Sequence, residues 1–142
     1  MGSGKSVIGR ELAALLGSAF ADLDRVIEQR VGAIAPYFKL NGEEDFRQVE
    51  REVLHEQLTR QDLVVATGGG TPFWWDNLDR MKAAGPVVFL DVPVAVLVAR
   101  LKRSGRDRPL LFGLDDAALE TKVIALHATR SDGYMNATYS VD

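Results

Sequence analysis

The chain opens with a glycine-rich segment, Met1-Gly2-Ser3-Gly4-Lys5-Ser6, that runs directly into an apolar helical pattern. It is the second half of a phosphate-loop motif, in which a glycine and four further residues precede Gly-Lys-Ser or Gly-Lys-Thr. Backbone N–H groups of such glycines and the N-terminus of the following helix attract a polyphosphate. Lys5 would reach the β- and γ-phosphates and Ser6 would ligate Mg²⁺. A flexible tag remnant is the alternative, but the direct junction to a helix favours a nucleotide site.

Composition limits the classes of protein to consider. A chain of 142 residues is one domain's worth, and its 46% apolar and 26% charged residues are those of an ordinary globular protein. The net charge of −3 predicts no bulk attraction to nucleic acid or to an anionic membrane. There is no cysteine, which removes disulfides and thiolate chemistry and is compatible with the cytoplasm. The two histidines, His55 and His127, are expected to be solvated helix residues rather than metal ligands.

Helical and strand patterns alternate along the chain. Apolar runs at 63–66 and 87–90 are typical of strands buried on both faces of a sheet. The pattern predicts an α/β layer fold with a parallel sheet in a single domain. The expected helices are 5–17, one ending at Gly32, 33–41, 43–60, about 74–83, 93–103 and one starting near Asp115; the other expected strands are 19–24 and one starting at 139.

Asp22 and Asp24 lie two residues apart at the end of a predicted strand. Residues i and i+2 of a strand share a face, so both carboxylates would point into the crevice beyond the carboxyl end of the sheet. One could hold Mg²⁺ through water while the other accepts a proton from a substrate hydroxyl. The alternative is that Asp24 caps the next helix and Asp22 is solvated.

Arg47 and Glu50 are one helical turn apart. A solvated ion pair is one interpretation. Arg47 also follows the apolar Phe46, at the edge of the expected buried side, where a guanidinium can bind a carboxylate with two hydrogen bonds.

Gly68, Gly69 and Gly70 follow the apolar run at 63–66 without a break. Three consecutive glycines cost backbone entropy on ordering, and a tight turn needs fewer. The triplet therefore favours a loop on whose bare backbone something packs, and we expect that loop to face a ligand.

Three arginines, Arg103, Arg106 and Arg108, fall in or beside the polar loop that runs to Gly113. Such a loop suits a lid that closes on phosphates, and an ordinary basic surface loop is the alternative.

Taken together, these segments resemble the shikimate kinases, small P-loop kinases of the nucleoside-monophosphate-kinase structural class. The matches follow the order and spacing of that family over the whole chain. They are Gly2 to Arg10, Phe20 to Asp24, Gly42-Glu43 with Phe46-Arg47 and Glu50, Ala66 to Gly70, Arg108 to Leu111, and Arg130 with Tyr134.

The resemblance implies a three-layer P-loop kinase fold with strand order 2-3-1-4-5 and transfer of the γ-phosphoryl group of ATP to the 3-hydroxyl of shikimate. It implies a single kinase domain over 1–142, with shikimate bound by about 25–60 and a lid at about 104–114. We expect a cytoplasmic monomer that binds ATP, Mg²⁺ and shikimate, and neither nucleic acid nor membrane.

The resemblance also assigns roles to residues. Gly2, Ser3, Gly4, Lys5 and Ser6 would bind ATP, and Ser6 with Asp22 would hold Mg²⁺. Asp24 would bind the shikimate hydroxyls and act as base, and Arg47 with Arg130 would clamp the carboxylate. Phe38 and Phe46 would form an apolar wall and Gly68, Gly69 and Gly70 a backbone cradle. Arg108 would reach the transferring group from the lid, and Arg100 would stack on adenine.

Two departures from the family pattern concern the ends. The strand before the phosphate loop and the helix after the last strand have no counterpart here, so we expect trimmed ends and a chain without its central strand. The other functions considered are a non-catalytic ligand-sensing domain of a regulator and a sister kinase acting on gluconate or a nucleotide.

Overall fold

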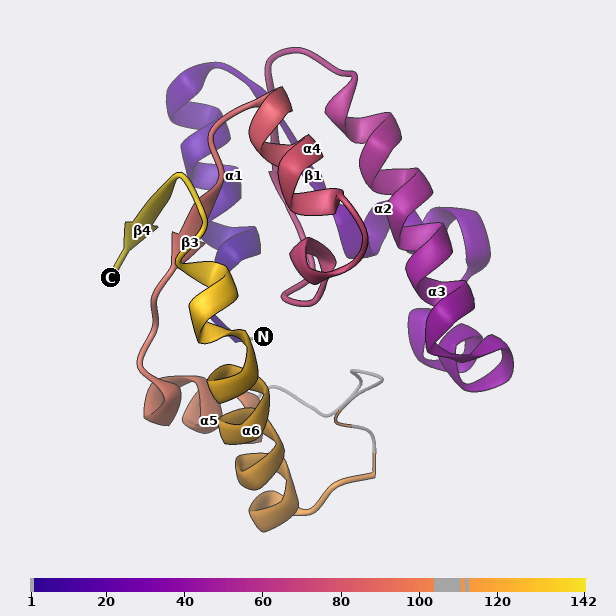
Figure 1. The fold of residues 1–142 in the computed structure, drawn as a ribbon, viewed down its shortest axis with the longest axis vertical. Helices are drawn as coiled ribbons and strands as arrows, with labels where there is room; N and C mark the ends of the chain where they lie inside the picture. Colours follow the sequence, from indigo (N-terminus) through magenta and orange to yellow (C-terminus); the bar gives the residue numbers. More distant parts are fainter. Residues whose placement is uncertain (1, 104–110, 112) are drawn as a thin grey trace. The chain divides into compact units, whose positions relative to one another are not determined.

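A computed structural model describes residues 2–103, 111 and 113–142, which fall into two compact units. The large unit comprises Gly4–Gly85, and the small unit comprises residues 2–3 and the described residues from 86 to 142. Figure 1 shows helices and strands alternating within both. The expectation that 1–142 is one kinase domain stays a prediction.

The large unit contains one pair of strands and most of the helices. Strands β1 and β2 are parallel, with Ala19 opposite Leu63 and Asp22 opposite Ala66. The segments that follow the two strands therefore leave the sheet at the same edge. The elements are α1 (Lys5–Leu16), β1 (Ala19–Asp22), α2 (Leu23–Val31), α3 (Ile34–Leu58), β2 (Leu63–Ala66), the 3₁₀ helix η1 (Thr71–Phe73) and α4 (Asn77–Ala84).

The break predicted at Asn41-Gly42 lies inside α3. Gly42 has φ 86° and ψ 177°, so two helical segments meet there at a kink. An L side chain rarely adopts this backbone conformation, whereas glycine does so without steric cost. The two helices expected on either side of Gly42 are therefore confirmed.

The core of the large unit lies between α2 and α3. Leu23, Ile27, Val53 and Leu54 are fully enclosed, and Phe46 is 6% exposed. Burying each such side chain contributes roughly 1.5–3 kcal/mol to folding. This packing determines which side of α3 is buried, and Phe46, Val53 and Leu54 point into the core from that side.

The small unit pairs its two strands in parallel and packs its two helices together. Its elements are β3 (Val88–Leu90), α5 (Val94–Arg103), α6 (Asp116–Tyr134) and β4 (Tyr139–Val141). The Asp115 carboxylate accepts a hydrogen bond from the Ala118 N–H at 2.8 Å, as expected of an N-cap. The core consists of Leu97, Val98, Leu101, Leu111, Leu119 and Val123.

The strand pairs agree with the predicted order. In the order 2-3-1-4-5, strands 2 and 3 are neighbours, as are 4 and 5, and these are the pairs β1–β2 and β3–β4. The prediction that 63–66 and 87–90 are buried on both faces is wrong. Only Ala66 of β2 is buried, and Val88 of β3 is 46% exposed. Each strand has a single strand neighbour among the described residues, so its other edge is uncovered by a strand.

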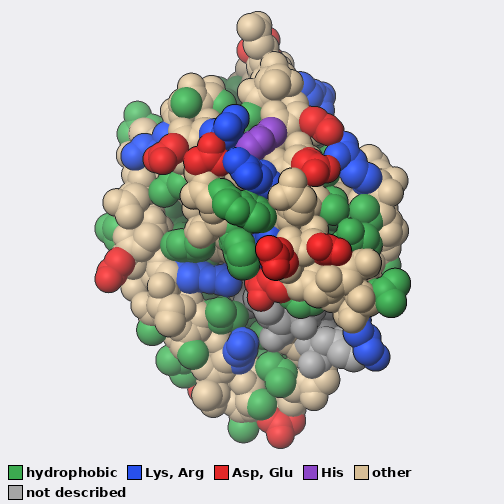
Figure 2. All heavy atoms as spheres, turned by 45° about the vertical axis from the view of Figure 1, so that its right-hand side comes forward, with side chains coloured by type: hydrophobic (Ala, Val, Ile, Leu, Met, Phe, Trp, Pro, Cys, Tyr) green, Lys and Arg blue, Asp and Glu red, His purple; other side chains and the backbone are tan. Residues whose placement is uncertain are grey.

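Among the described residues, acidic and basic side chains are interspersed on the face drawn in Figure 2, and they form no continuous basic patch there. An anion site among these residues would therefore depend on a few local cations.

No helix within the described ranges combines the length and the apolar character needed to cross a bilayer.

Candidate active site

The phosphate loop leads straight into α1. Gly4 is the N-cap residue, with φ 90° and no side-chain cap hydrogen bond, and the first turn of the helix contains no acid. No negative side chain of α1 itself therefore offsets the positive end of the helix dipole, where the first-turn amides lie. This is the local arrangement that the motif predicts for phosphate binding.

Ser6 and Asp22 meet at the edge of the sheet. The Ser6 hydroxyl, in the first turn of α1, donates a hydrogen bond to Asp22 Oδ2 at 2.5 Å. Asp22 is the last residue of β1, so the loop-to-helix junction and the strand end converge there. Hydroxyl and carboxylate oxygens are the ligands that Mg²⁺ prefers, so the pair fits the predicted metal role.

No cluster of three or more His, Cys, Asp or Glu side chains suited to a metal occurs within the described ranges. Magnesium bound to nucleotide phosphates commonly needs only one or two protein carboxylates.

Asp24 is not on the strand, which corrects the sequence interpretation. The strand ends at Asp22, whose Oδ1 accepts a hydrogen bond from the Asp24 N–H at 3.2 Å and caps α2. Asp24 lies in the first turn of that helix, and the capping role considered for it belongs to Asp22. Helix geometry, rather than strand alternation, therefore orients Asp24. Its Oδ1 is still close to the glycine turn, 3.9 Å from where a Cβ on Gly68 would lie.

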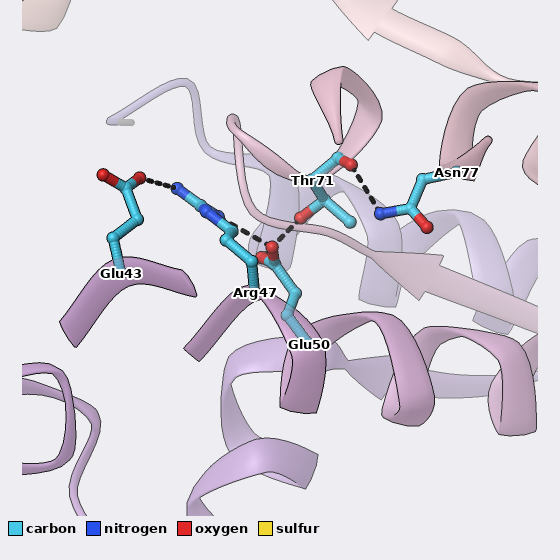
Figure 3. Close-up of polar contacts among 5 residues, drawn as sticks. All are labelled: Glu43, Arg47, Glu50, Thr71 and Asn77. Atoms are coloured by element: carbon cyan, nitrogen blue, oxygen red, sulfur yellow. Dashed lines mark hydrogen bonds and ion pairs between the residues drawn. The ribbon is translucent and has the colours of Figure 1, made fainter. Parts of the chain in front are cut away.

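Arg47 is a buried cation between two glutamates of its own helix. It is 5% exposed, and its Nη1 donates to Glu50 Oε2 at 2.7 Å (Figure 3). Its Nη2 donates to Glu43 Oε1 at 3.1 Å, and Glu50 is 1% exposed. The interpretation of Arg47 and Glu50 as a solvated ion pair is therefore wrong. A buried guanidinium held this way has a defined orientation, as recognition of a carboxylate requires.

Aromatic rings lie near the Arg47 guanidinium. Its Cζ lies 5.3 Å from the ring centroid of Phe46 and 5.4 Å from that of Trp74. Phe38 contacts Phe46, with ring centroids 5.5 Å apart, so the two predicted wall residues are adjacent. Trp74 was missed by sequence reasoning. An aromatic pair, Trp74-Trp75, shortly after a glycine turn was the available signal.

The glycine turn is packed by the same ion pair. A Cβ on Gly70 would lie 2.7 Å from Arg47 Nη2, and a Cβ on Gly68 would lie 2.9 Å from Glu50 Oε1. The prediction that a group packs on the bare backbone of the turn is confirmed, and the groups seen there are the side chains of Arg47 and Glu50. Asp24, Arg47 and the turn thus gather where β1 and β2 end.

A second charged cluster lies along α3 and α4, outside this site. The Asp76 carboxylate accepts from Arg80 and Arg51, at 2.6 and 2.9 Å, and the hydrogen bond from Arg80 lowers the pKa of Asp76. His55 is half-buried rather than solvated. Burial, followed by the charges of Arg80 and Arg51, lowers the pKa of His55, and Asp76 opposes them.

The remaining predicted site residues belong to the small unit or lie outside the described residues. Arg100 Nη1 donates to the carbonyl oxygens of Gly2 and Ser3, at 3.2 and 3.3 Å, so it binds the phosphate-loop backbone. Arg130 is hydrogen-bonded to Tyr134, and burial raises the pKa of Tyr134 against the opposing effect of that arginine. Arg130 and Arg47 belong to different units. Arg106, Arg108 and the centre of the predicted lid lie outside the described residues.

Parallel strands alternating with helices and a Gly-Ser-Gly-Lys-Ser loop at a helix N-terminus are typical of the P-loop nucleotide-binding proteins, the class that includes the P-loop kinases. The family model described as "Shikimate kinase" matches residues 1–141. The chain is 39% identical over 143 residues to a shikimate kinase of Parabacteroides distasonis, covering 100% of this chain and 83% of the relative. It belongs to the shikimate kinase family.

Solved structures agree with this assignment. The 1.7 Å crystal structure of shikimate kinase from Bacteroides thetaiotaomicron matches with a TM-score of 0.92 and 37% identity, over 100% of this chain and 81% of that one. Shikimate kinase from Acinetobacter baumannii in complex with shikimate matches with a TM-score of 0.92 and 40% identity, over 100% and 78% of the two chains. The predicted P-loop kinase fold is thereby confirmed.

Proposed function

We propose that this protein transfers the γ-phosphoryl group of ATP to the 3-hydroxyl of shikimate. The observation that carries the proposal is the buried Arg47 guanidinium beside the glycine turn and Asp24, in a unit whose first helix follows a phosphate loop. A cation held in this orientation suits a small acceptor with one carboxylate, and an acid nearby suits its hydroxyls. Membership of the shikimate kinase family supports the same acceptor.

On the nucleotide side, the backbone of Gly2, Ser3 and Gly4 and the Lys5 ammonium would hold the phosphates of ATP. Ser6 and Asp22, already in contact, would hold Mg²⁺, Asp22 through water. When bound, Mg²⁺ neutralises charge on the phosphate oxygens during transfer.

On the acceptor side, Arg47 and Arg130 would bind the shikimate carboxylate, with Phe38 and Phe46 against the ring. The backbone of Gly68, Gly69 and Gly70 would contact the other side. The 3-hydroxyl oxygen would attack the γ-phosphorus while the bond from that phosphorus to the ADP oxygen breaks. Asp24 would accept the hydroxyl proton, so the products are shikimate 3-phosphate and ADP.

Two arginines would complete the site. Arg108 would stabilise charge on the transferring phosphoryl group, where a cation lowers the barrier most. Arg100 would stack on adenine, and its bonds to the carbonyl oxygens of Gly2 and Ser3 would change when nucleotide binds. That the protein is a cytoplasmic monomer that binds neither nucleic acid nor membrane stays a prediction.

The test is ADP formation in the presence and absence of shikimate, with gluconate as a second acceptor. We expect ADP to form only when shikimate is present. Binding of shikimate without turnover would instead support a ligand-sensing domain, and turnover with gluconate alone would support a sister kinase.

A further inference from the structure

Thr71 is the residue that completes the hydrogen bonding of Glu50. It is fully buried, and its hydroxyl donates to Glu50 Oε1 at 2.7 Å (Figure 3). The other oxygen of the same carboxylate, Oε2, accepts from Arg47 Nη1 at 2.7 Å. The buried Glu50 carboxylate therefore bridges two donors, one on its own helix and one at the end of the glycine turn.

Thr71 is itself held from two sides. Its N–H donates to the carbonyl oxygen of Gly68 at 3.2 Å, and its own carbonyl accepts from Asn77 Nδ2 at 2.9 Å. Asn77, the first residue of α4, is completely buried. These two hydrogen bonds fix the backbone of Thr71. The position of its hydroxyl, and of the hydrogen bond to Glu50, is thereby fixed as well.

We propose that Thr71 is a positioning residue for the acceptor: its hydroxyl orients the Glu50 carboxylate, and Glu50 in turn orients the Arg47 guanidinium against the glycine turn. The inference rests on the proposed function, in which Arg47 binds the carboxylate of shikimate. Thr71 itself touches neither substrate nor nucleotide in this account.

The physical reason is the cost of a buried carboxylate oxygen without a donor. If the hydroxyl is removed, Glu50 Oε1 loses the side-chain donor that it has among the described residues. A buried acceptor without a donor is strongly unfavourable. The carboxylate then rotates to share the Arg47 hydrogen bonds. Because Arg47 is enclosed by Gly70, Phe46 and Trp74, a small rotation of its planar fork misaligns it for the acceptor.

Two matched substitutions test this inference. Thr71→Val replaces the hydroxyl by a methyl group of similar size, and Thr71→Ser keeps the hydroxyl while losing the methyl. We expect T71V to raise the KM for shikimate about ten-fold, with the KM for ATP unchanged. T71S should stay within about two-fold of wild type. A purely structural role would change the KM for ATP together with the KM for shikimate.

A second comparison asks whether Thr71 acts through the carboxylate of the acceptor. With shikimate methyl ester, whose ester group carries no charge, T71V and wild type should have the same kcat/KM. With shikimate, T71V should be about ten-fold lower. The T71V-to-wild-type ratio of kcat/KM with shikimate, divided by the same ratio with the methyl ester, measures the coupling between Thr71 and the substrate carboxylate.

An equal loss with shikimate and with its methyl ester, or an unchanged shikimate KM in folded T71V, would overturn the inference. If T71V does not fold, Thr71→Ala removes the same donor without adding a methyl group, and the same comparisons apply. A wild-type protein without shikimate-dependent ADP formation would overturn the proposed function as well. Normal wild-type turnover with an unaffected T71V or T71A would overturn the role of Thr71 alone.

Discussion

The guanidinium of Arg47 lies directly against the backbone of Gly70. A Cβ built on Gly70 would be 2.7 Å from Arg47 Nη2 and 3.1 Å from its Cζ. The backbone of Gly70 has φ −90° and ψ −20°, which other residues also adopt, so the constraint at this position is space rather than conformation. Because Arg47 is buried, it cannot simply swing into solvent to make room.

Gly70→Ala is therefore expected to displace Arg47. Overpacking of this kind costs about 1–3 kcal/mol, so the KM for shikimate should rise about ten-fold or more while the KM for ATP is unchanged. Steady-state kinetics with each substrate varied measure both. Gly85→Ala, where no atom lies within 4 Å of the new Cβ, is the matched control. Equal behaviour of the two variants would contradict the close packing at Gly70.

Arg47→Lys keeps the charge but removes the planar fork. An ammonium cannot form the two parallel hydrogen bonds to a carboxylate, so we expect shikimate binding to weaken about ten- to hundred-fold in a calorimetric titration. Arg51→Lys, one turn along the same helix, makes the same change at the Asp76 pair and should leave shikimate affinity unchanged. An R47K protein with wild-type affinity would remove Arg47 from the acceptor site.

Asp24→Asn should abolish most turnover without preventing nucleotide binding. The amide cannot accept the proton of the acceptor hydroxyl, and a general base typically contributes about 10²–10⁴-fold to the rate. Single-turnover kinetics and an ATP titration separate the two effects. Asp45→Asn, at an exposed position of α3, is the control. Near-normal turnover in D24N would show that another group accepts the proton.

Asp22→Asn separates the metal role of Asp22 from its capping role. Asparagine is as good an N-cap as aspartate, so the melting temperature should change little. The loss of charge next to Ser6 should raise the Mg²⁺ concentration needed for half-maximal activity. A Mg²⁺ titration at constant ATP measures this. An unaltered Mg²⁺ requirement would leave Asp22 with the cap alone.

The lowered pKa of His55 predicts a pH dependence of stability. Its ordinary value is 6.5, and burial, Arg80 and Arg51 hold the folded-state pKa below that, with Asp76 opposing. As the pH falls through the unfolded-state pKa, the unfolded chain takes up a proton before the folded protein does, which lowers the free energy of unfolding. His55 therefore destabilises the protein in acid and has no such effect above its unfolded-state pKa.

The melting temperature of His55→Gln should accordingly fall less than that of wild type between about pH 7 and about pH 5. Parallel curves for wild type and H55Q would show that His55 has the same pKa in the folded and unfolded states, and would contradict a lowered folded-state pKa.

Much of the fold could be predicted from local patterns. The helix at 5–17, its end at Gly17, the break at Gly42 and the cap at Asp115 are where the structure has them. Capping and glycine conformation depend on a few neighbouring residues, so a linear sequence contains them. The phosphate-loop motif is local in the same way, because it consists of a few consecutive residues before the helix.

The candidate site was predicted less completely. Asp22 and Asp24 were expected to share a strand face, but the first turn of α2 begins between them. Arg47 and Glu50 were identified without their environment, and Thr71, Asn77 and Trp74 were not identified at all. Nothing in the spacing of these residues indicates that a 3₁₀ turn after β2 reaches a side chain on α3.

The sequence by itself determined the α/β class, the phosphate loop and the identity of the chemical groups, since these depend on composition, periodicity and short motifs. Only the tertiary structure decided that Arg47 and Glu50 are buried and that the glycine turn packs on them. The physical reason is that burial and hydrogen bonding join residues more than twenty positions apart, such as Glu50 and Thr71, and these contacts exist only once α3 is packed beside the end of β2.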